Sequence, residues 1–129
     1  MLKKLLVLAA LTAGFALAQK PVYELRTYTA EPGKLEALKA RFRDHTIAIF
    51  KKHHMESVGY WVPSDGDASK NTLIYILKHP SRAEAEKNWD AFRTDPDWVK
   101  ASTESEKNGK LVTKVDRVWM DATAFSALK

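Results

Sequence analysis

The chain has 129 residues, enough for one domain with a sizeable hydrophobic core. Its formal net charge is +5, but the basic residues are spread along the sequence and often lie beside acidic ones. This arrangement is typical of a solvated surface and disfavours a nucleic-acid-binding protein, which gathers positive charge on one face. The sequence contains no cysteine, which excludes disulfides, thiolate metal sites and a cysteine nucleophile.

Residues 1–18 have the pattern of a secretory signal peptide. A basic start at Lys3 and Lys4 is followed by an apolar run over residues 5–15. Residues 16–18 read Ala-Leu-Ala and fit the small-x-small cleavage rule. The run is too short for an ordinary membrane-spanning helix, although a retained anchor is the alternative. We expect cleavage after Ala18, a periplasmic or secreted protein without stable membrane insertion, and one domain over residues 19–129.

The stretch from Val22 to Lys34 alternates like a β-strand and stops at a Pro-Gly turn. Side chains of a strand point to opposite faces with period two. Glu24, Arg26 and Tyr28 therefore share one face, and the residues between them share the other. A first strand that directs a carboxylate and a guanidinium to one side suggests that the fold is built around that side.

A long amphipathic helix is predicted over Gly33–His53, because apolar residues recur there at spacings of three, four and seven. An aromatic and β-branched strand follows over Glu56–Pro63, and then a polar turn over Ser64–Lys70. Asn71–Lys78 is the clearest strand of the sequence. Its nearly continuous apolar sequence predicts a central position in the sheet.

Two further helices and a last strand complete the prediction. Ser81 and Glu84 have capping-box spacing at the start of one helix. Asp95-Pro96 is a second start signal, with Asp as the N-cap and Pro in the first turn. The last strand is predicted over Leu111–Ala122.

The order strand, helix, strand, strand, helix, strand predicts an α+β, ferredoxin-like fold. In this fold the helices cover one face of a four-stranded antiparallel sheet. Both faces of the strands carry large apolar residues, for example Ile74 and Ile76 opposite Leu73 and Tyr75. A face exposed to solvent would not have this composition. We therefore expect a homodimer in which a second copy covers the bare face, where we place Leu73, and the two sheets close into a dimeric α/β barrel.

Several motifs resemble the NIPSNAP family. Residues 23–28 read Tyr-Glu-Leu-Arg-Thr-Tyr, and together with Pro32-Gly33 they resemble the opening of NIPSNAP domains. The resemblance extends over about Val22 to Thr123. It includes Lys52-His53 ahead of Val58–Trp61, Asn71 four residues before Tyr75, and the later Trp89, Phe92, Asp95 and Trp98.

The resemblance implies a dimeric α/β-barrel fold and leaves the activity open. Similar barrels host monooxygenases, haem-handling enzymes, dismutating lyases and binding proteins. The chain departs from the family at His54, where a Gly usually follows the histidine that ends the first helix. The sequence therefore leaves the turn geometry at this position open.

Glu24 and Arg26 are the main candidates for a functional site. A buried charge is costly unless it is paired, so one interpretation is a structural ion pair that fixes the dimer register. In the other interpretation, Arg26 holds a ligand carboxylate or enolate bidentately in an apolar pocket. The residues that we predict to bind a ligand are Glu24, Arg26, Tyr28, His53, Trp61 and Tyr75.

Trp61 and Tyr75 are either core aromatics or walls of a pocket for a flat ligand. His53 is either a hydrogen-bonded core or cap residue, or a proton-transfer residue or axial haem ligand. His45 and His53 both fall on the apolar side of the predicted helix, roughly 12 Å apart by the helical rise, so they cannot chelate one ion. We expect no metal and no cofactor.

Three functional hypotheses follow. In the first, the cavity binds a small, mostly apolar or aromatic molecule with one acidic group that Arg26 orients. The alternative is a cofactor-independent monooxygenase or isomerase that stabilises an enolate. The second alternative is a structural or protein-interaction module with a filled barrel. A titratable group with a displaced pKa inside the cavity would favour an enzyme over a binding protein.

Overall fold

A computed structural model describes residues 20–129, so the predicted signal peptide and its cleavage site lie outside the described residues. No helix in the described part of the chain is both long and apolar enough to cross a membrane. In chain order the elements are β1 (Val22–Ala30), α1 (Leu35–Arg41), the π-helical turn η1 (Phe42–Thr46), α2 (Ile47–Lys52), β2 (Glu56–Trp61), the 3₁₀ turn η2 (Asp67–Lys70), β3 (Thr72–His79), α3 (Arg82–Thr94), α4 (Pro96–Ser105) and β4 (Val112–Met120).

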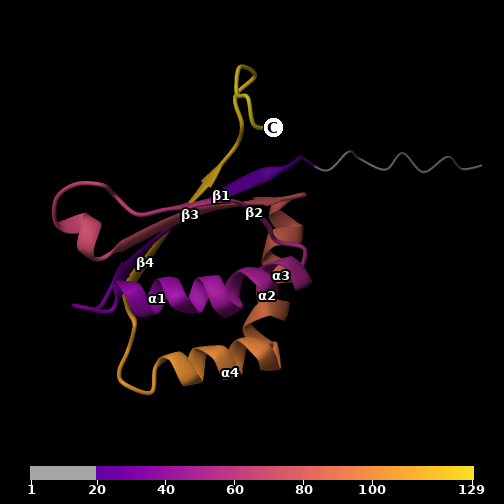
Figure 1. The fold of residues 1–129 in the computed structure, drawn as a ribbon. Coiled ribbons are helices and arrows are strands. Elements are labelled where there is room, and N and C mark those ends of the chain that lie inside the picture. The colour runs from indigo at the N-terminus through magenta and orange to yellow at the C-terminus, as the bar shows by residue number, and fades with distance from the viewer. Residues whose placement is uncertain (1–19) are drawn as a thin grey trace, which may run out of the picture.

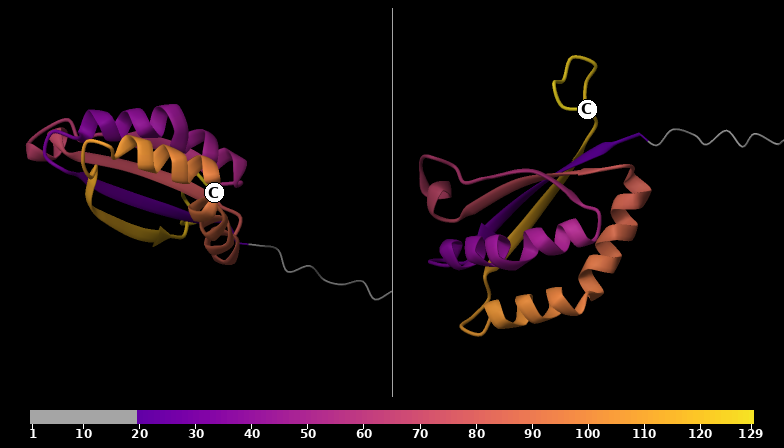
Figure 2. Two further views of the ribbon diagram at one scale, coloured as in Figure 1. Left: turned by 90° about the horizontal axis from the view of Figure 1, so that it is seen from below. Right: turned by 45° about the vertical axis from the view of Figure 1, so that its right-hand side comes forward.

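The four strands form one antiparallel sheet in the order β2-β3-β1-β4. The first strand of the chain lies between β3 and β4, which is the split βαβ arrangement. The helices gather on one side of the sheet (Figure 1), and the turned views show the same layering (Figure 2). The predicted α+β, ferredoxin-like fold is confirmed.

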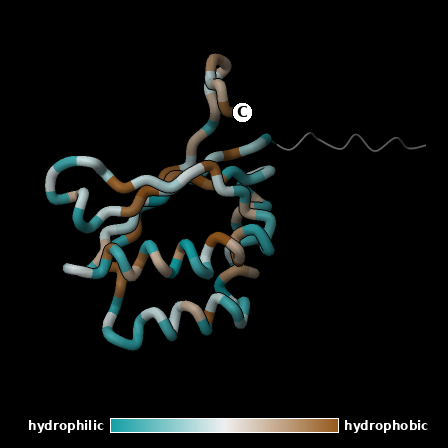
Figure 3. The backbone as a smooth tube through the Cα atoms, viewed as in Figure 1, coloured by the Kyte–Doolittle hydropathy of each residue, from teal (hydrophilic) through white to brown (hydrophobic). Residues whose placement is uncertain are grey.

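One face of the sheet packs against the helices and is here called the inner face. Leu73, Tyr75 and Leu77 alternate along β3 on this face and are all buried. They form one core cluster with buried helix residues such as Phe50 and Phe92. Apolar segments follow the strands, whereas the connection between α4 and β4 is hydrophilic (Figure 3). The helices therefore bury a single face of the sheet.

Glu24, Arg26 and Tyr28 of β1 also lie on the inner face. The indole Nε1 of Trp89 on α3 donates a hydrogen bond to Glu24 at 2.8 Å, and the ring of Tyr28 lies 5.5 Å from that of Phe42 on η1. The charged face of the first strand is thus enclosed between the sheet and the helices.

The opposite face, here called the outer face, is covered by no helix of residues 20–129. It carries Leu25, whose neighbours across the sheet are Ile76 on β3 and Val118 on β4. Val118 is 51% exposed. The prediction that Leu73 lies on this bare face is wrong, because the alternation along β3 turns Leu73 toward the helices, where it is 4% exposed.

Both predicted helix starts are confirmed. Ser81 is the N-cap of α3, and its hydroxyl accepts a hydrogen bond from the N–H of Glu84 at 3.1 Å. Asp95 caps α4 by accepting from the N–H of Asp97 at 2.8 Å, with Pro96 in the first turn. Because Asp95 also ends α3, the two helices meet at this residue.

The helix predicted over Gly33–His53 begins at Leu35 and is interrupted by η1. A π-turn contains one more residue than an α-turn, so it rotates the following residues about the helix axis. Thr46 consequently occupies a buried position, whereas His45 is exposed. The predicted place of His45 on the apolar side is therefore wrong.

His54 makes the turn after α2 with a left-handed backbone conformation, φ +59°. The N–H of Met55 donates to the carbonyl of Phe50 at 2.9 Å, and that of His54 donates to Lys51 at 3.2 Å. This pair of bonds is a Schellman motif, which usually has Gly at the left-handed position. His54 therefore adopts, without being glycine, the left-handed conformation that this turn requires.

Candidate functional site

A cavity of about 160 Å³ lies between the inner face of the sheet and the helices. The sheet contributes Arg26 and Tyr28, and the other walls are mainly aromatic. Among the described residues that line the cavity there is neither a carboxylate nor a histidine. The lining residues are Arg26, Tyr28, Phe42, Thr46, Phe50, Trp89, Phe92, Arg93 and Trp98.

The π-turn η1 shapes one wall of the cavity. Phe42 and Thr46, its first and last residues, both line the cavity. The hydroxyl of Thr46 donates to the carbonyl of Arg41, five residues earlier, at 3.2 Å. Single π-turns inside α-helices occur frequently at functional sites. Here the turn places a small polar side chain in an aromatic wall.

The aromatic walls are held in place by packing and by a buried arginine. The rings of Phe92 and Trp98 lie 4.7 Å apart, centre to centre. The guanidinium carbon of Arg41 lies 5.2 Å from the ring centre of Trp98. Arg41 is 5% exposed, and its Nη1 donates to Glu106 at 3.4 Å. Arg41 thus fastens α1 to the end of α4 behind the cavity.

Arg26 presents a charged group to this aromatic cavity. Its Nη1 donates to Glu24 at 3.2 Å, and its Nη2 donates to the hydroxyl of Tyr28 at 3.2 Å. The guanidinium carbon lies 4.3 Å from the ring centre of Trp89, within the range of a cation–π interaction. Burial alone would lower the pKa of Arg26. The phenols of Tyr75 and Tyr28 and the carboxylate of Glu24 raise it by more, so the pKa lies above its ordinary value and the group stays charged.

Glu24 is fully buried and is stabilised as a carboxylate by several donors. Its Oε1 accepts from His79 at 2.9 Å and from Trp89 at 2.8 Å, while Oε2 accepts from Arg26. Burial raises the pKa of Glu24, but the hydrogen bonds from His79 and Trp89 and the charge of Arg26 lower it below its ordinary value. Glu24 is therefore an ionised residue that positions Arg26 from behind.

Two tyrosines extend this hydrogen-bonded chain toward the cavity. The hydroxyl of Tyr75 donates to that of Tyr28 at 3.1 Å. Tyr75 is fully buried, and burial raises its pKa well above the ordinary value. It therefore stays a neutral donor.

The structure brings together four of the predicted ligand-binding residues: Glu24, Arg26, Tyr28 and Tyr75. Only Arg26 and Tyr28 of these line the cavity, while Glu24 and Tyr75 lie behind them. Alternation along β1 was enough to predict which of its residues share a face. Their ligand-binding role stays a prediction.

His53 and Trp61 lie away from the cavity lining. The Nε2 of His53 is 2.6 Å from Oδ2 of Asp95, the cap of α4, an arrangement that fits the interpretation of His53 as a cap histidine. Trp61 pairs with Ile74 across the sheet, lies on the outer face and is 50% exposed.

Sequence reasoning missed Arg41, Thr46 and Arg93 as parts of the site. Arg41 follows Leu38 by three residues on the apolar side of the helix, and this spacing was a signal that it is buried. Thr46 had no such signal, since only the π-turn brings it inward. Arg93 looks like a surface residue in the sequence and still lines the cavity from the last turn of α3.

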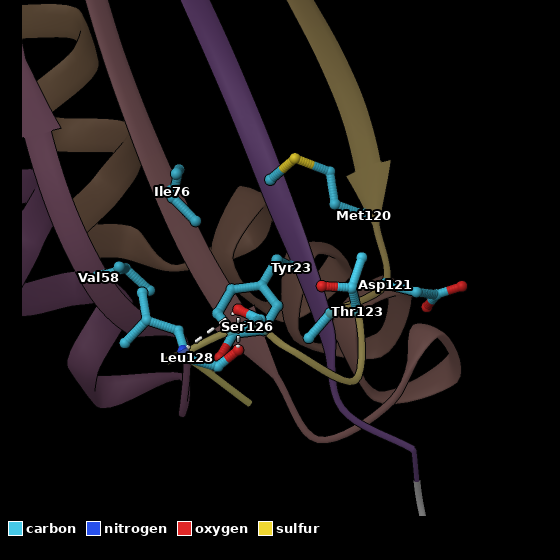
Figure 4. Close-up of a pocket in the computed structure, with 9 residues that line it drawn as sticks. Tyr23, Val58, Ile76, Met120, Asp121, Thr123, Ser126 and Leu128 are labelled. Atoms are coloured by element: carbon cyan, nitrogen blue, oxygen red, sulfur yellow. Dashed lines mark hydrogen bonds between the residues drawn. The ribbon is translucent and has the colours of Figure 1, made fainter.

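A second hollow, of about 280 Å³, lies on the outer face beneath the C-terminal tail. Tyr23, Ile76 and Met120 line it from the sheet, and Ser126 and Leu128 line it from the tail (Figure 4). Its walls are mainly apolar, and it lies on the face that we expect a second copy to cover. We therefore assign the candidate site to the inner cavity.

The fold is similar to several solved structures. A NIPSNAP family protein of unknown function from Agrobacterium tumefaciens is 25% identical with a TM-score of 0.73, over 86% of this chain and 96% of that chain. A NIPSNAP-like domain protein from Burkholderia xenovorans is 16% identical with a TM-score of 0.72, over 84% of this chain and 90% of that chain. SnoaB, a cofactor-independent oxygenase from Streptomyces nogalater, is 14% identical with a TM-score of 0.56, over 85% of this chain and 99% of that chain.

No curated protein matches the sequence. A sequence model of the NIPSNAP family matches residues 23–127, which is most of the chain. The match includes Glu24 and Arg26 of β1 and all later strands and helices. The chain therefore belongs to the NIPSNAP family.

Proposed function

We propose that the protein binds a small, mainly apolar or aromatic molecule with one acidic group in the inner cavity. The position of Arg26 carries this proposal, since it places a permanent positive charge in the wall of an otherwise mainly aromatic cavity. A guanidinium that is largely removed from water favours an anionic partner with matching hydrogen-bond acceptors. Glu24 meets only part of this demand, because His79 and Trp89 occupy its Oε1, and Arg117 lies 3.8 Å from the Oε2 that accepts from Arg26.

The size of the cavity limits the ligand to about one aromatic ring. An apolar protein cavity of roughly 150 Å³ is known to hold benzene. The inner cavity, at about 160 Å³, is comparable, and its aromatic walls suit a flat molecule. A cavity inside the protomer also favours ligand binding over a purely structural or protein-interaction module.

A cofactor-independent oxygenase or isomerase of the dimeric α/β-barrel class is the second candidate. The similarity of the fold to that of SnoaB favours it, as does the displaced pKa of Tyr75 behind the cavity. However, the displacement keeps Tyr75 protonated, and no described residue that lines the cavity is an obvious general base. We therefore place binding before catalysis.

We also propose that the protein is a homodimer joined through the outer faces of its sheets. Val118 and Trp61 are each about half exposed on this face, at 51% and 50%. Apolar side chains gathered on a sheet face that no described helix covers are typical of an interaction surface. A second copy of the chain fits it sheet against sheet.

Isothermal titration calorimetry with a panel of one-ring acids, each paired with a neutral analogue of similar shape, tests the binding proposal. We expect acids such as benzoate to bind about tenfold or more tightly than amides such as benzamide, which corresponds to roughly 1.4 kcal/mol. Arg26→Met should abolish this preference. Arg43→Met is the matched control, because Arg43 is exposed and pairs with Asp44. If no member of the panel binds, the proposal fails.

A further inference from the structure

We propose that the inner cavity holds its ligand by a single anionic oxygen, that of a phenolate or enolate on a one-ring molecule. In this arrangement the hydroxyl of Tyr28 donates a hydrogen bond to the oxygen, and Arg26 supplies the positive charge. The inference rests on the proposed binding function. It narrows the ligand from acids in general to those whose charge can lie on one oxygen.

The hydroxyl of Tyr28 has a proton that no described residue takes up. It accepts from Nη2 of Arg26 at 3.2 Å and from the hydroxyl of Tyr75 at 3.1 Å. Two phenols joined by one hydrogen bond carry two protons, and the bond uses only one of them. Tyr75 is fully buried, so an unpaired proton there would be costly, whereas Tyr28 lines the cavity. The unused proton therefore belongs to Tyr28 and is available to an acceptor in the cavity.

Arg26 is poorly arranged to hold a carboxylate with both arms of its fork. One N–H of Nη1 donates to Glu24 and one N–H of Nη2 donates to Tyr28, which leaves one N–H on each. Nε is buried without a hydrogen-bond partner in the described part of the chain, so the edge that pairs Nε with Nη is closed to a ligand. A carboxylate prefers two parallel N–H bonds from an unoccupied fork. A single oxygen next to the Tyr28 hydroxyl and the guanidinium matches the available donors better.

Positive charge dominates the surroundings of these donors. Arg26 lies directly opposite Arg117 on β4, and like charges in this position repel one another. In the described residues, Glu24 is the only carboxylate that forms an ion pair with either of them, at 3.2 Å and 3.8 Å. Arg93 is a third guanidinium at the cavity wall, but Asp90 pairs with it at 2.7 Å, so the unbalanced charge is that of Arg26 and Arg117. An anionic oxygen in the cavity would offset this excess of positive charge.

Spectrophotometric titration of 4-nitrophenol with the protein tests the inference, since only the phenolate absorbs visible light strongly. The apparent pKa of the bound phenol should fall by about one unit or more, which means that the phenolate binds about tenfold or more tightly than the phenol. Nitrobenzene, which has no acidic group, should bind with an affinity that does not change with pH in the same range.

Two variants identify the contribution of Tyr28. Tyr28→Phe should remove most of the pKa displacement and leave the affinity for nitrobenzene nearly unchanged. Because this change leaves Tyr75 without its acceptor, Tyr28→Phe/Tyr75→Phe is measured beside it and should show the same loss. Tyr60→Phe is the matched control: the hydroxyl of Tyr60 bonds to that of Ser57 at 2.7 Å, and Tyr60 does not line the cavity. This variant should keep the full displacement.

The possible results separate the inference from the proposed function. If 4-nitrophenol binds with an unchanged pKa, the single-oxygen site is overturned and ligand binding stands. If benzoate binds more tightly than 4-nitrophenolate and Tyr28→Phe changes neither affinity, the site is one for carboxylates and the inference is again overturned. If neither nitro compound nor benzoate binds, the inference falls together with the proposed function.

Discussion

Glu24 shows how a single carboxylate can organise the inner face of the sheet. It is fully buried, yet its oxygens accept hydrogen bonds from His79, Trp89 and Arg26. Loss of one partner of a buried charge pair costs more than the pair contributes, because the other partner is left unpaired. Glu24 and Arg26 should therefore differ in their effects on stability, since Glu24 has more partners.

Glu24→Gln should lower the free energy of unfolding by on the order of 3–5 kcal/mol. The new amide nitrogen would face the donors His79 and Trp89, and Arg26 would lose its carboxylate. Arg26→Met should cost clearly less, because His79 and Trp89 still donate to Glu24 and Arg117 lies 3.8 Å from it. Urea denaturation measures both values.

Glu36→Gln is the control for these two variants. Glu36 is an exposed residue on α1 that pairs with Lys39 at 2.9 Å, and exposed ion pairs contribute little to stability. If Arg26→Met destabilises the protein as much as Glu24→Gln, Arg26 is only a structural partner, and its proposed ligand role loses its physical basis.

Asp95 should make the stability of the protein fall in acid. Three hydrogen bonds hold the pKa of Asp95 below its ordinary value. The one from Lys52 has the largest effect, and those from His53 and from the N–H of Asp97 have smaller ones. A carboxylate with a lowered folded-state pKa stabilises the fold above its ordinary pKa, and this stabilisation is lost as pH falls toward the folded-state pKa. We expect Asp95→Asn to melt below the parent at neutral pH.

The pH dependence distinguishes this charge effect from a simple loss of packing. The difference in melting temperature between the parent and Asp95→Asn should shrink as the pH falls below about 4, because Asp95 of the unfolded parent then takes up a proton while Asp95 of the folded parent still resists protonation. Melting curves at a series of pH values provide the measurement. A difference that stays constant from neutral to acidic pH would contradict the role given to the Asp95 carboxylate.

The turn that ends α2 offers a test at the scale of a single element. His54 holds the left-handed position of a Schellman motif, a conformation that costs an L-residue about 1–2 kcal/mol and glycine almost nothing. His54 is exposed, and its N–H bond to Lys51 would remain in a variant. His54→Gly should therefore raise the free energy of unfolding by about 1 kcal/mol, as measured by urea denaturation.

His45→Gly is the opposite control within the same helical region. His45 is exposed in η1 and has a helical backbone, so glycine there should destabilise the protein by roughly 0.5–1 kcal/mol. If His54→Gly also destabilised the protein, the left-handed conformation would not be the source of strain at that position.

The sequence predicted the strands and the amphipathic helices because alternation and helical periodicity are local patterns. The π-turn was not predictable from them. Leu38 and Phe42 fit an uninterrupted α-helix, and one extra residue in a turn leaves no sign in composition. Of the site, Arg26 and Tyr28 followed from alternation along β1, whereas the place of Thr46 depends on η1.

At the scale of the whole molecule, the sequence could not show which face of the sheet the helices cover. Both faces of β3 are apolar, so alternation separates Leu73 and Tyr75 from Ile74 and Ile76 without assigning either set to the interior. That choice depends on how the helices close over the sheet. The sequence therefore predicted correctly that Leu73 and Ile74 lie on opposite faces of the sheet, but it placed Leu73 on the wrong face.

We also propose that the protein is exported and that its mature chain begins at Gln19. The basis is the pattern of basic start, apolar run and Ala-Leu-Ala over residues 1–18. N-terminal sequencing of protein recovered from the periplasm or the medium of expressing cells should give Gln19 as the first residue. Recovery of soluble protein that still begins with Met1 would contradict the prediction.

The proposed homodimer can be tested with two residues of the same strand. Val118 lies opposite Leu25 on the outer face and is 51% exposed, whereas Val115 lies opposite Tyr28 on the inner side of β4 and is 42% exposed. Val118→Asp would bury a charge between the two sheets, so it should yield monomer or aggregate in sedimentation velocity. Val115→Asp introduces the same charge at similar exposure outside that interface and should leave the dimer intact.

The two variants together distinguish an interface from a general loss of stability. Aspartate disfavours β-strands at either position, so an effect on folding alone should appear in both melting curves. A change in sedimentation confined to Val118→Asp would then come from the outer face. If the parent itself sediments as a stable monomer, no second copy covers this face, and the apolar side chains around Leu25 and Ile76 must serve a different partner.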